Sequence, residues 1–182
     1  MKKIERQIHG FMYEKFIINK YRLIVSEKYT SKFDAYTKSG VPVQIKCIKE
    51  GNCIDLGDFK RNQSITSDFI LILGRWRNKK NKIVDEKIFH IDYKLYNELC
   101  TFDHTNKMLE EMKAISNDVS DDNIWLSFCK KYRCIYPQSN IIKLRFKRDH
   151  KKQKRIQCGM SETNYRNIFC KKFKKLENLN DL

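Results

Sequence analysis

Three polar residues in one short stretch carry side chains suited to phosphate chemistry. Asp34 lies in a β-prone run, and Gln44 and Lys46 lie in the next such run, after a turn at residues 38–40. Carboxylate and amide oxygens are ligands that Mg²⁺ accepts. A lysine beside the metal can hold the attacked phosphate or position the attacking water. The combination indicates metal-assisted hydrolysis of a phosphate ester.

The surrounding pattern predicts how these side chains are positioned. Residues 33–37 and 41–48 read as two strands of a hairpin, and the strand period of two places Gln44 and Lys46 on one face. The other face carries four apolar residues: Val41, Val43, Ile45 and Cys47. Residues 4–21 have the apolar spacing of an amphipathic helix that carries Glu14. Its expected buried stripe consists of Ile4, Ile8, Phe11, Met12, Phe16 and Ile17.

Further elements complete an α/β (α+β) core. We expect a strand at 21–26, a short helix at 56–65, a strand at 68–74 covered on both faces, a strand at 83–91 and a helix capped by Asp92. Residues 101–139 read as mainly helical, with a packing role. Residues 141–146 and 155–160 form a second hairpin, and Ser161 caps a last helix.

The first part of this pattern resembles the PD-(D/E)XK nuclease superfamily. Asp34 matches the first carboxylate, Gln44 the second acidic position, Lys46 the lysine, and Glu14 the acidic residue that many members carry on the first helix. The resemblance covers about residues 4 to 100. It implies a restriction-endonuclease-like αβββαβ core with a mixed sheet. It also implies a catalytic set of these four residues, with Mg²⁺, or Mn²⁺ as a substitute, held by Asp34, Gln44 and Glu14.

Two departures from the family pattern affect the expected chemistry. Phe33 replaces the proline, which changes nothing essential, whereas Gln44 replaces an acid and removes one negative charge from the metal site. Metal affinity should fall, although an amide oxygen still binds Mg²⁺. Taken singly, Asp34 also fits a turn cap and Lys46 a solvated strand lysine. Their joint occurrence behind a helix that carries Glu14 favours the catalytic interpretation.

The charge of the chain predicts a polyanionic partner. The formal net charge is +16, and residues 143–175 hold thirteen basic and two acidic residues, a net of +11. A solvated basic tail is the alternative, but basic and apolar residues alternate here as in a strand with one cationic face. The expected DNA-binding residues are Lys143, Arg145, Lys147, Arg148, Lys151, Lys152, Gln153, Lys154 and Arg155, with Arg61 and Asn62 in the first part of the chain.

The function expected from these observations is a Mg²⁺-dependent endonuclease that cuts specific double-stranded DNA sites. The resemblance is to type II restriction endonucleases, and it implies a homodimer, because a palindrome needs two active sites. A homing or junction-resolving nuclease of the same fold, a non-catalytic DNA-binding protein and an RNA-binding protein remain open alternatives. No glycine-rich phosphate loop occurs, so no nucleotide cofactor is expected.

Length and composition set the remaining expectations. The 182 residues fit a single domain, divided into a catalytic core at 1–100, a helical packing segment at 101–139 and a basic hairpin and helix at 140–175. The seven cysteines form no CxxC pair, which favours reduced thiols. No signal peptide or membrane span is evident, so we expect a soluble, cytoplasmic protein.

Overall fold

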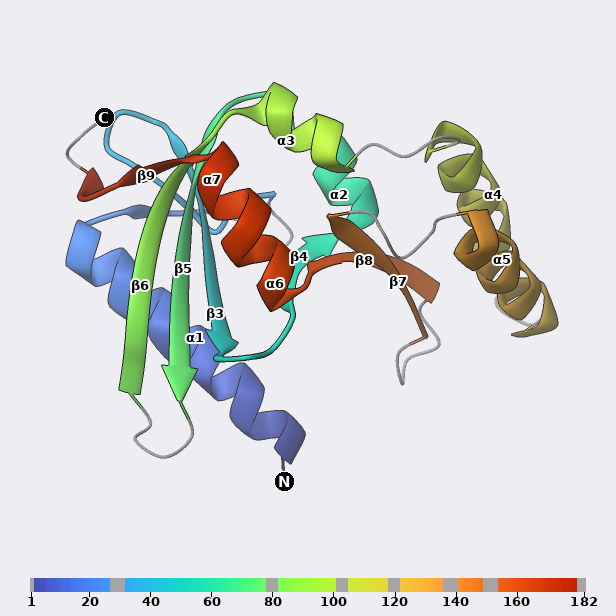
Figure 1. Cartoon of the computed structure of the whole chain (residues 1–182), viewed down its shortest axis with the longest axis horizontal. Helices are drawn as coiled ribbons and strands as arrows, with labels where there is room; N and C mark the ends of the chain where they lie inside the picture. Colours follow the sequence, from blue (N-terminus) through green and yellow to red (C-terminus); the bar gives the residue numbers. More distant parts are fainter. Residues whose placement is uncertain are drawn as a thin grey trace.

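The computed structural model describes residues 2–26, 32–77, 82–100, 105–117, 122–135, 141–148 and 154–179. Two sheets organise the fold (Figure 1). The larger has six strands in the order β1-β2-β3-β5-β6-β9, and the smaller has three in the order β4-β8-β7. Only the β3–β5 pair of the larger sheet is parallel, so the sheet is mixed. The predicted α+β class and mixed sheet are confirmed.

The larger sheet is built around strand β5 (Phe69–Arg77), whose first six residues are all buried. The prediction of a strand covered on both faces is therefore confirmed. The neighbouring strands are β1 (Ile24–Val25), β2 (Ala35–Tyr36), β3 (Pro42–Lys49), β6 (Lys82–Ile91) and β9 (Lys174–Leu176). The hairpin predicted around residues 38–40 is the β2–β3 pair. Strand β9 was not predicted.

Helix α1 (Lys2–Tyr21) packs along one face of this sheet. Tyr13 and Ile17 are buried there with Val43 and Ile45 of β3, and the Tyr13 ring lies where a side chain at Gly74 would sit. The predicted stripe is therefore wrong in part. Three of its residues are exposed by half or more: Phe11, Met12 and Phe16. The i, i+4 pair that faces the sheet includes Tyr13, an amphipathic residue outside the predicted stripe.

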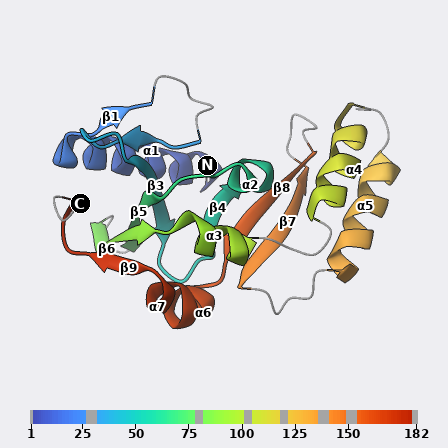
Figure 2. The ribbon, with the colours of Figure 1, turned by 90° about the horizontal axis from the view of Figure 1, so that it is seen from above.

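The opposite face of the larger sheet packs in a second hydrophobic core, separate from the one beneath α1. Buried residues of the smaller sheet belong to this second core as well. The segment after Asp92 forms α3 (Tyr93–Cys100), and Asp92 accepts a hydrogen bond from the Leu95 amide as predicted for a cap. The apolar face of the smaller sheet packs on α5 (Asp122–Ile135), where Phe146 contacts Trp125 and Phe128. Helices α4 (Thr105–Asn117) and α5 lie beyond β7, away from the larger sheet (Figure 2).

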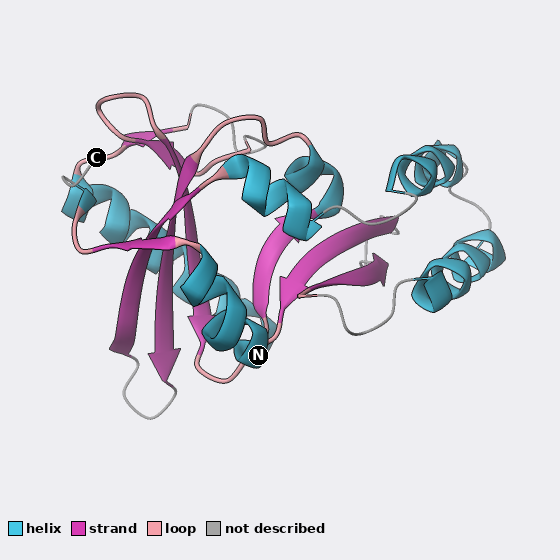
Figure 3. Ribbon diagram, turned by 45° about the horizontal axis from the view of Figure 1, so that its top comes forward, coloured by secondary structure: helices cyan, strands magenta, loops and turns pink. Residues whose placement is uncertain are grey.

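The smaller sheet departs most from prediction. Residues 56–65 were expected to be one helix, but strand β4 (Ile54–Asp58) comes first and helix α2 (Phe59–Gln63) follows. Strand β4 pairs with β8 (Lys154–Met160), which also pairs with β7 (Ile142–Arg148) in the predicted hairpin. The residue-100 boundary therefore does not separate the two sheets, because β4 joins a sheet otherwise made of C-terminal strands (Figure 3).

The chain then returns to the larger sheet through one bent helical segment. Ser161 caps it as predicted, by accepting a hydrogen bond from the Asn164 amide. The segment runs through α6 (Glu162–Asn164), a π-helical turn η1 (Tyr165–Phe169) and α7 (Cys170–Lys172) before β9. Tyr165 and Phe169 are buried against Phe89 of β6. Within the described ranges, no helix has the length and apolar character needed to cross a membrane.

Candidate active site

Asp34 is held by the backbone of the strands around it. Its amide donates to the carbonyl of Val43 (3.0 Å) and its carbonyl accepts from the Ser26 amide (3.2 Å). Its carboxylate accepts the backbone N–H of Ile45 (2.7 Å). Because β2 pairs with β3 only at Ala35 and Tyr36, the Asp34 side chain takes over a β3 amide that β2 leaves free. Its carboxylate is therefore fixed against the edge of β3.

Gln44 and Lys46 lie on the same face of β3, as the strand period predicts. In the parallel register they stand beside Leu71 and Leu73 of β5. Both side chains are half-buried, and the Gln44 amide nitrogen donates to the Asp34 carboxylate. Part of the negative charge of Asp34 is thus compensated by an amide group. A half-turn of that amide exchanges its nitrogen for its oxygen at the same place.

Glu14 reaches this group from helix α1. Burial raises the pKa of its carboxyl, the charge of Asp34 raises it further, and the ammonium of Lys46 opposes the shift. Glu14 is therefore within electrostatic range of both Asp34 and Lys46, although α1 packs on the face of β3 opposite to Lys46. Of the four residues that the sequence singled out for chemistry, Asp34 and Gln44 are joined by a hydrogen bond, and Glu14 senses the charges of Asp34 and Lys46.

A small cavity lies behind Gln44 and Lys46. It has a volume of about 20 Å³, enough for about one water molecule, and Leu56, Asn62 and Tyr96 also line it. Strand β4, helix α2 and helix α3 therefore meet beside Gln44 and Lys46 of β3. This contact fixes the smaller sheet beside the candidate active site.

The donor set fits a hard divalent cation. The charge of Asp34 disfavours ionisation of Glu14, a condition that a cation relieves, and Gln44 can add an amide oxygen. In the described part of the chain, no cluster of three or more histidine, cysteine, aspartate or glutamate side chains is present. The oxygen-only set favours Mg²⁺ or Mn²⁺ over softer metals.

Two of the predicted DNA-binding residues are buried and serve the fold instead. Asn62 is 5% exposed; its Nδ2 donates to the carbonyls of Leu56 (3.1 Å) and Asp58 (3.0 Å), and its Oδ1 accepts from Tyr96 (2.9 Å). Lys154 is 8% exposed and stands on the apolar side of β8. The predicted DNA contacts of these two residues are corrected accordingly, because the Asn62 amide is bonded within the fold and Lys154 stands on the side of β8 opposite to the polar face.

The other predicted DNA-binding residues divide into three groups. Arg61 is exposed on α2. Lys143, Arg145, Lys147 and Arg155 share the polar face of the smaller sheet, since antiparallel partners project to the same side. Arg148 is described by its backbone alone, and Lys151, Lys152 and Gln153 lie outside the described residues.

Sequence reasoning missed two residues of this polar face. Gln157 stands opposite Arg145, and Gly159 stands opposite Lys143. A glycine inside a strand signals that something approaches the backbone closely, and this signal was present in the sequence. The group that approaches is the Arg145 guanidinium, which occupies the space that a Cβ at Gly159 would need.

Comparison with known proteins adds no relative to this description: the chain matches no protein-family model and no curated protein.

Proposed function

We propose that this protein is a metal-dependent endonuclease that hydrolyses phosphodiester bonds in double-stranded DNA, with a PD-(D/E)XK-like active site. The observation that carries the proposal is the Asp34 carboxylate, which is anchored by the Ile45 amide, together with Glu14, whose carboxyl feels the charges of both Asp34 and Lys46. If Asp34 served only as a turn cap, the fold would not require a second carboxylate and a lysine within electrostatic range of each other.

Each of the four residues has a separate role in the proposed reaction. Asp34, Glu14 and the amide oxygen of Gln44 would hold the metal ion. Lys46 orients the attacking water and stabilises the negative charge that develops on the phosphate. Mg²⁺, when bound, polarises the phosphate and lowers the pKa of the attacking water. Cutting both strands requires two such sites, so we expect two copies of the chain on one DNA.

The direct test is cleavage of a long supercoiled DNA with and without Mg²⁺. We expect Mg²⁺-dependent cutting by the wild type, and a loss of about 100-fold or more in Asp34→Ala and Lys46→Ala, since electrostatic groups of this kind contribute about that much. Lys49→Ala is the matched control, because it removes the same charge from the same strand on the other face. Equal cutting by Lys46→Ala and Lys49→Ala would refute the assignment.

A second function has one specific observation in its favour. The hydrogen bond from Gln44 to Asp34 satisfies the carboxylate without a metal, which is what a non-catalytic DNA-binding protein of this fold would retain. Gln44→Glu separates the two functions. In an active enzyme the variant restores a carboxylate and should lower the Mg²⁺ concentration needed for cleavage. A protein that binds DNA, but cuts it neither as wild type nor as Gln44→Glu, belongs to the non-catalytic class.

A further inference from the structure

The polar face of the smaller sheet carries cations that the fold leaves unneutralised. It consists of Lys143, Arg145, Lys147, Arg155, Gln157 and Gly159. Within the described ranges, none of its four basic side chains pairs with a carboxylate. Basic residues elsewhere do find such partners: Arg75 bonds to Asp85 and Glu162, and Arg77 bonds to Glu50. The charge on this face is therefore available to a ligand.

The centre of the face holds polar atoms that are buried and unsatisfied. Gln157 is 9% exposed, and its Oε1 has no hydrogen-bond partner among the described residues. The same holds for Nη2 of Arg145, directly opposite, and for Nε of Arg155. A buried polar group without a partner is costly, and native proteins keep such groups mainly where a ligand or water completes them.

The nearest carboxylates do not supply these partners. Asp55 stands opposite Gly159 on β4, and its Oδ1 accepts the Gly57 amide (2.9 Å). Asp58 caps α2 by accepting the Arg61 amide (3.2 Å). Both acids serve local turns. The unsatisfied set is thus two guanidinium groups and one amide on the same face of the smaller sheet.

We propose that Arg145 and Gln157 read base edges in the major groove of duplex DNA, while Lys143, Lys147 and Arg155 bind the flanking phosphates. Glutamine pairs with the adenine edge through one donor and one acceptor, and arginine pairs with the two acceptors of guanine. Strands that enter a groove are an established means of base recognition. The major groove of double-stranded RNA is too narrow for side chains to read, so the substrate class is B-form DNA.

This inference rests on the proposed function, which supplies DNA as the substrate. It assigns the specificity for DNA sequence to residues at the middle of the smaller sheet. The smaller sheet is joined to the catalytic strand through Leu56 of β4, which lines the same cavity as Gln44 and Lys46. Bases held on this face are therefore held at a fixed position relative to the active site. Strand β4 therefore sets the distance between the bases that are read and the bond that is cut.

The test is a selection from a pool of randomised duplex DNA, performed with the full chain carrying Lys46→Ala so that binding is observed without cleavage. We expect one enriched sequence. Adding Gln157→Leu should reduce the discrimination between correct and incorrect bases at one or two base pairs by about 10- to 100-fold. Gly159→Ala should change the preference as well, because its methyl group displaces the Arg145 guanidinium without removing any charge.

Lys143→Ala is the matched control on the same face. It should weaken binding to every sequence equally and leave the enriched sequence unchanged. Circular dichroism melting establishes whether each variant folds. If Gln157→Leu does not fold, Gly159→Ala still provides the test. An enriched sequence that survives both Gln157→Leu and Gly159→Ala overturns the inference, as does equal binding of double-stranded RNA.

The outcome can be separated from that of the proposed function. A protein that cuts DNA without any enriched sequence overturns this inference and leaves the nuclease intact. A protein that selects a sequence through Gln157, yet never cuts as the wild type, overturns the nuclease and leaves this inference intact.

Discussion

At the scale of single residues, Glu14 carries a carboxyl group whose ionised form is disfavoured by the fold. Burial and the neighbouring Asp34 raise the pKa of its carboxyl in the folded protein above the value of about 4.3 in an unfolded chain. The folded state therefore holds the proton more tightly. The stability this provides is complete below about pH 4 and is lost as the pH rises through the folded pKa.

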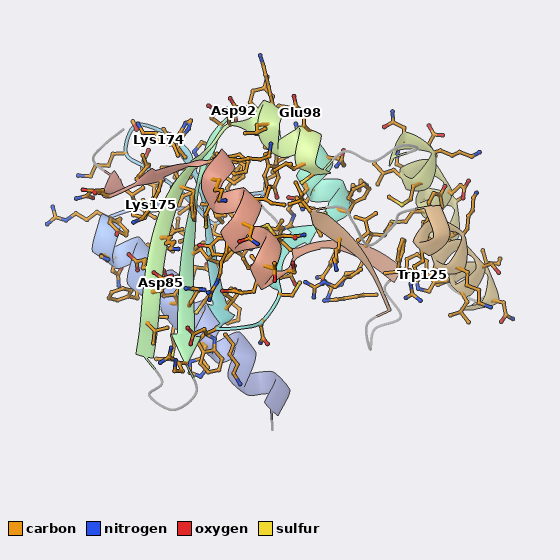
Figure 4. The ribbon with its side chains drawn as sticks, in the orientation of Figure 1. Asp85, Asp92, Glu98, Trp125, Lys174 and Lys175 are labelled. Atoms are coloured by element: carbon orange, nitrogen blue, oxygen red, sulfur yellow. The ribbon has the colours of Figure 1, made fainter. Side chains whose placement is uncertain are left out.

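Glu14→Gln should consequently raise the free energy of unfolding at pH 7, because the amide resembles the protonated acid. The gain should disappear as the pH falls below about 4.3. Urea unfolding at a series of pH values measures it. Glu98→Gln, on an exposed position of α3 (Figure 4), removes a carboxylate away from the site and serves as the control. A gain that persists at pH 4 would mean that Glu14 acts through packing instead of charge.

At the scale of elements, a buried hydrogen-bond network ties β4, α2 and α3 together. Asn62 of α2 binds carbonyls of β4 and the cap, and accepts a hydrogen bond from Tyr96 of α3. Tyr96→Phe leaves the Asn62 oxygen without that donor and should cost about 1–3 kcal/mol of stability. Chemical denaturation measures the loss. Tyr93→Phe, on the same helix, is the control, since the Tyr93 hydroxyl makes no hydrogen bond within the described part of the chain and its loss should change little.

The elements that sequence reasoning found are those whose pattern is local. Strands β3 and β5 show the expected periods, and Asp92 and Ser161 announce the helices that follow them. Strand β4 was missed because its five residues include a glycine and two aspartates, all poor strand formers. Only its pairing with β8, about a hundred residues later, makes it a strand. Strand β9 has three residues and depends on β6 in the same way.

The candidate site follows the same rule. Alternation along β3 placed Gln44 and Lys46 on one face, and the hairpin brought Asp34 beside them, so local pattern was sufficient. Asn62 could not be assigned from sequence, because its burial depends on Tyr96 from another helix. The role of Gln157 was hidden for a similar reason: its neighbours on the polar face come from a different strand.

At the scale of the whole molecule, a chain of net charge +16 that binds DNA as proposed should bind it in a salt-dependent way. Each phosphate contact contributes about −0.9 to the slope of log affinity against log salt, so the three cations proposed to bind phosphates give about −2.7. Affinity for any duplex should fall about 40-fold between 50 and 200 mM salt. Fluorescence anisotropy with a fixed duplex measures the slope.

The double variant Lys143→Ala/Lys147→Ala should reduce this slope by about two. Lys174→Ala/Lys175→Ala removes the same charge from β9, which lies on the other side of the larger sheet from Trp125 and the smaller sheet (Figure 4). It should leave the slope unchanged. An equal effect of the two double variants would indicate diffuse attraction by the total charge.

The pairing of β4 with β8 would also limit how the proposed DNA preference of the polar face could change. Strand β4 follows β3 directly, whereas β8 belongs to the C-terminal hairpin, and β9 then returns to the edge of the larger sheet. A transplanted hairpin would have to reproduce both the β4 pairing and the return to β6. The proposed recognition surface could therefore not be exchanged by transplanting the C-terminal hairpin alone. New DNA targets would have to arise by point substitutions on the polar face, within an unchanged scaffold.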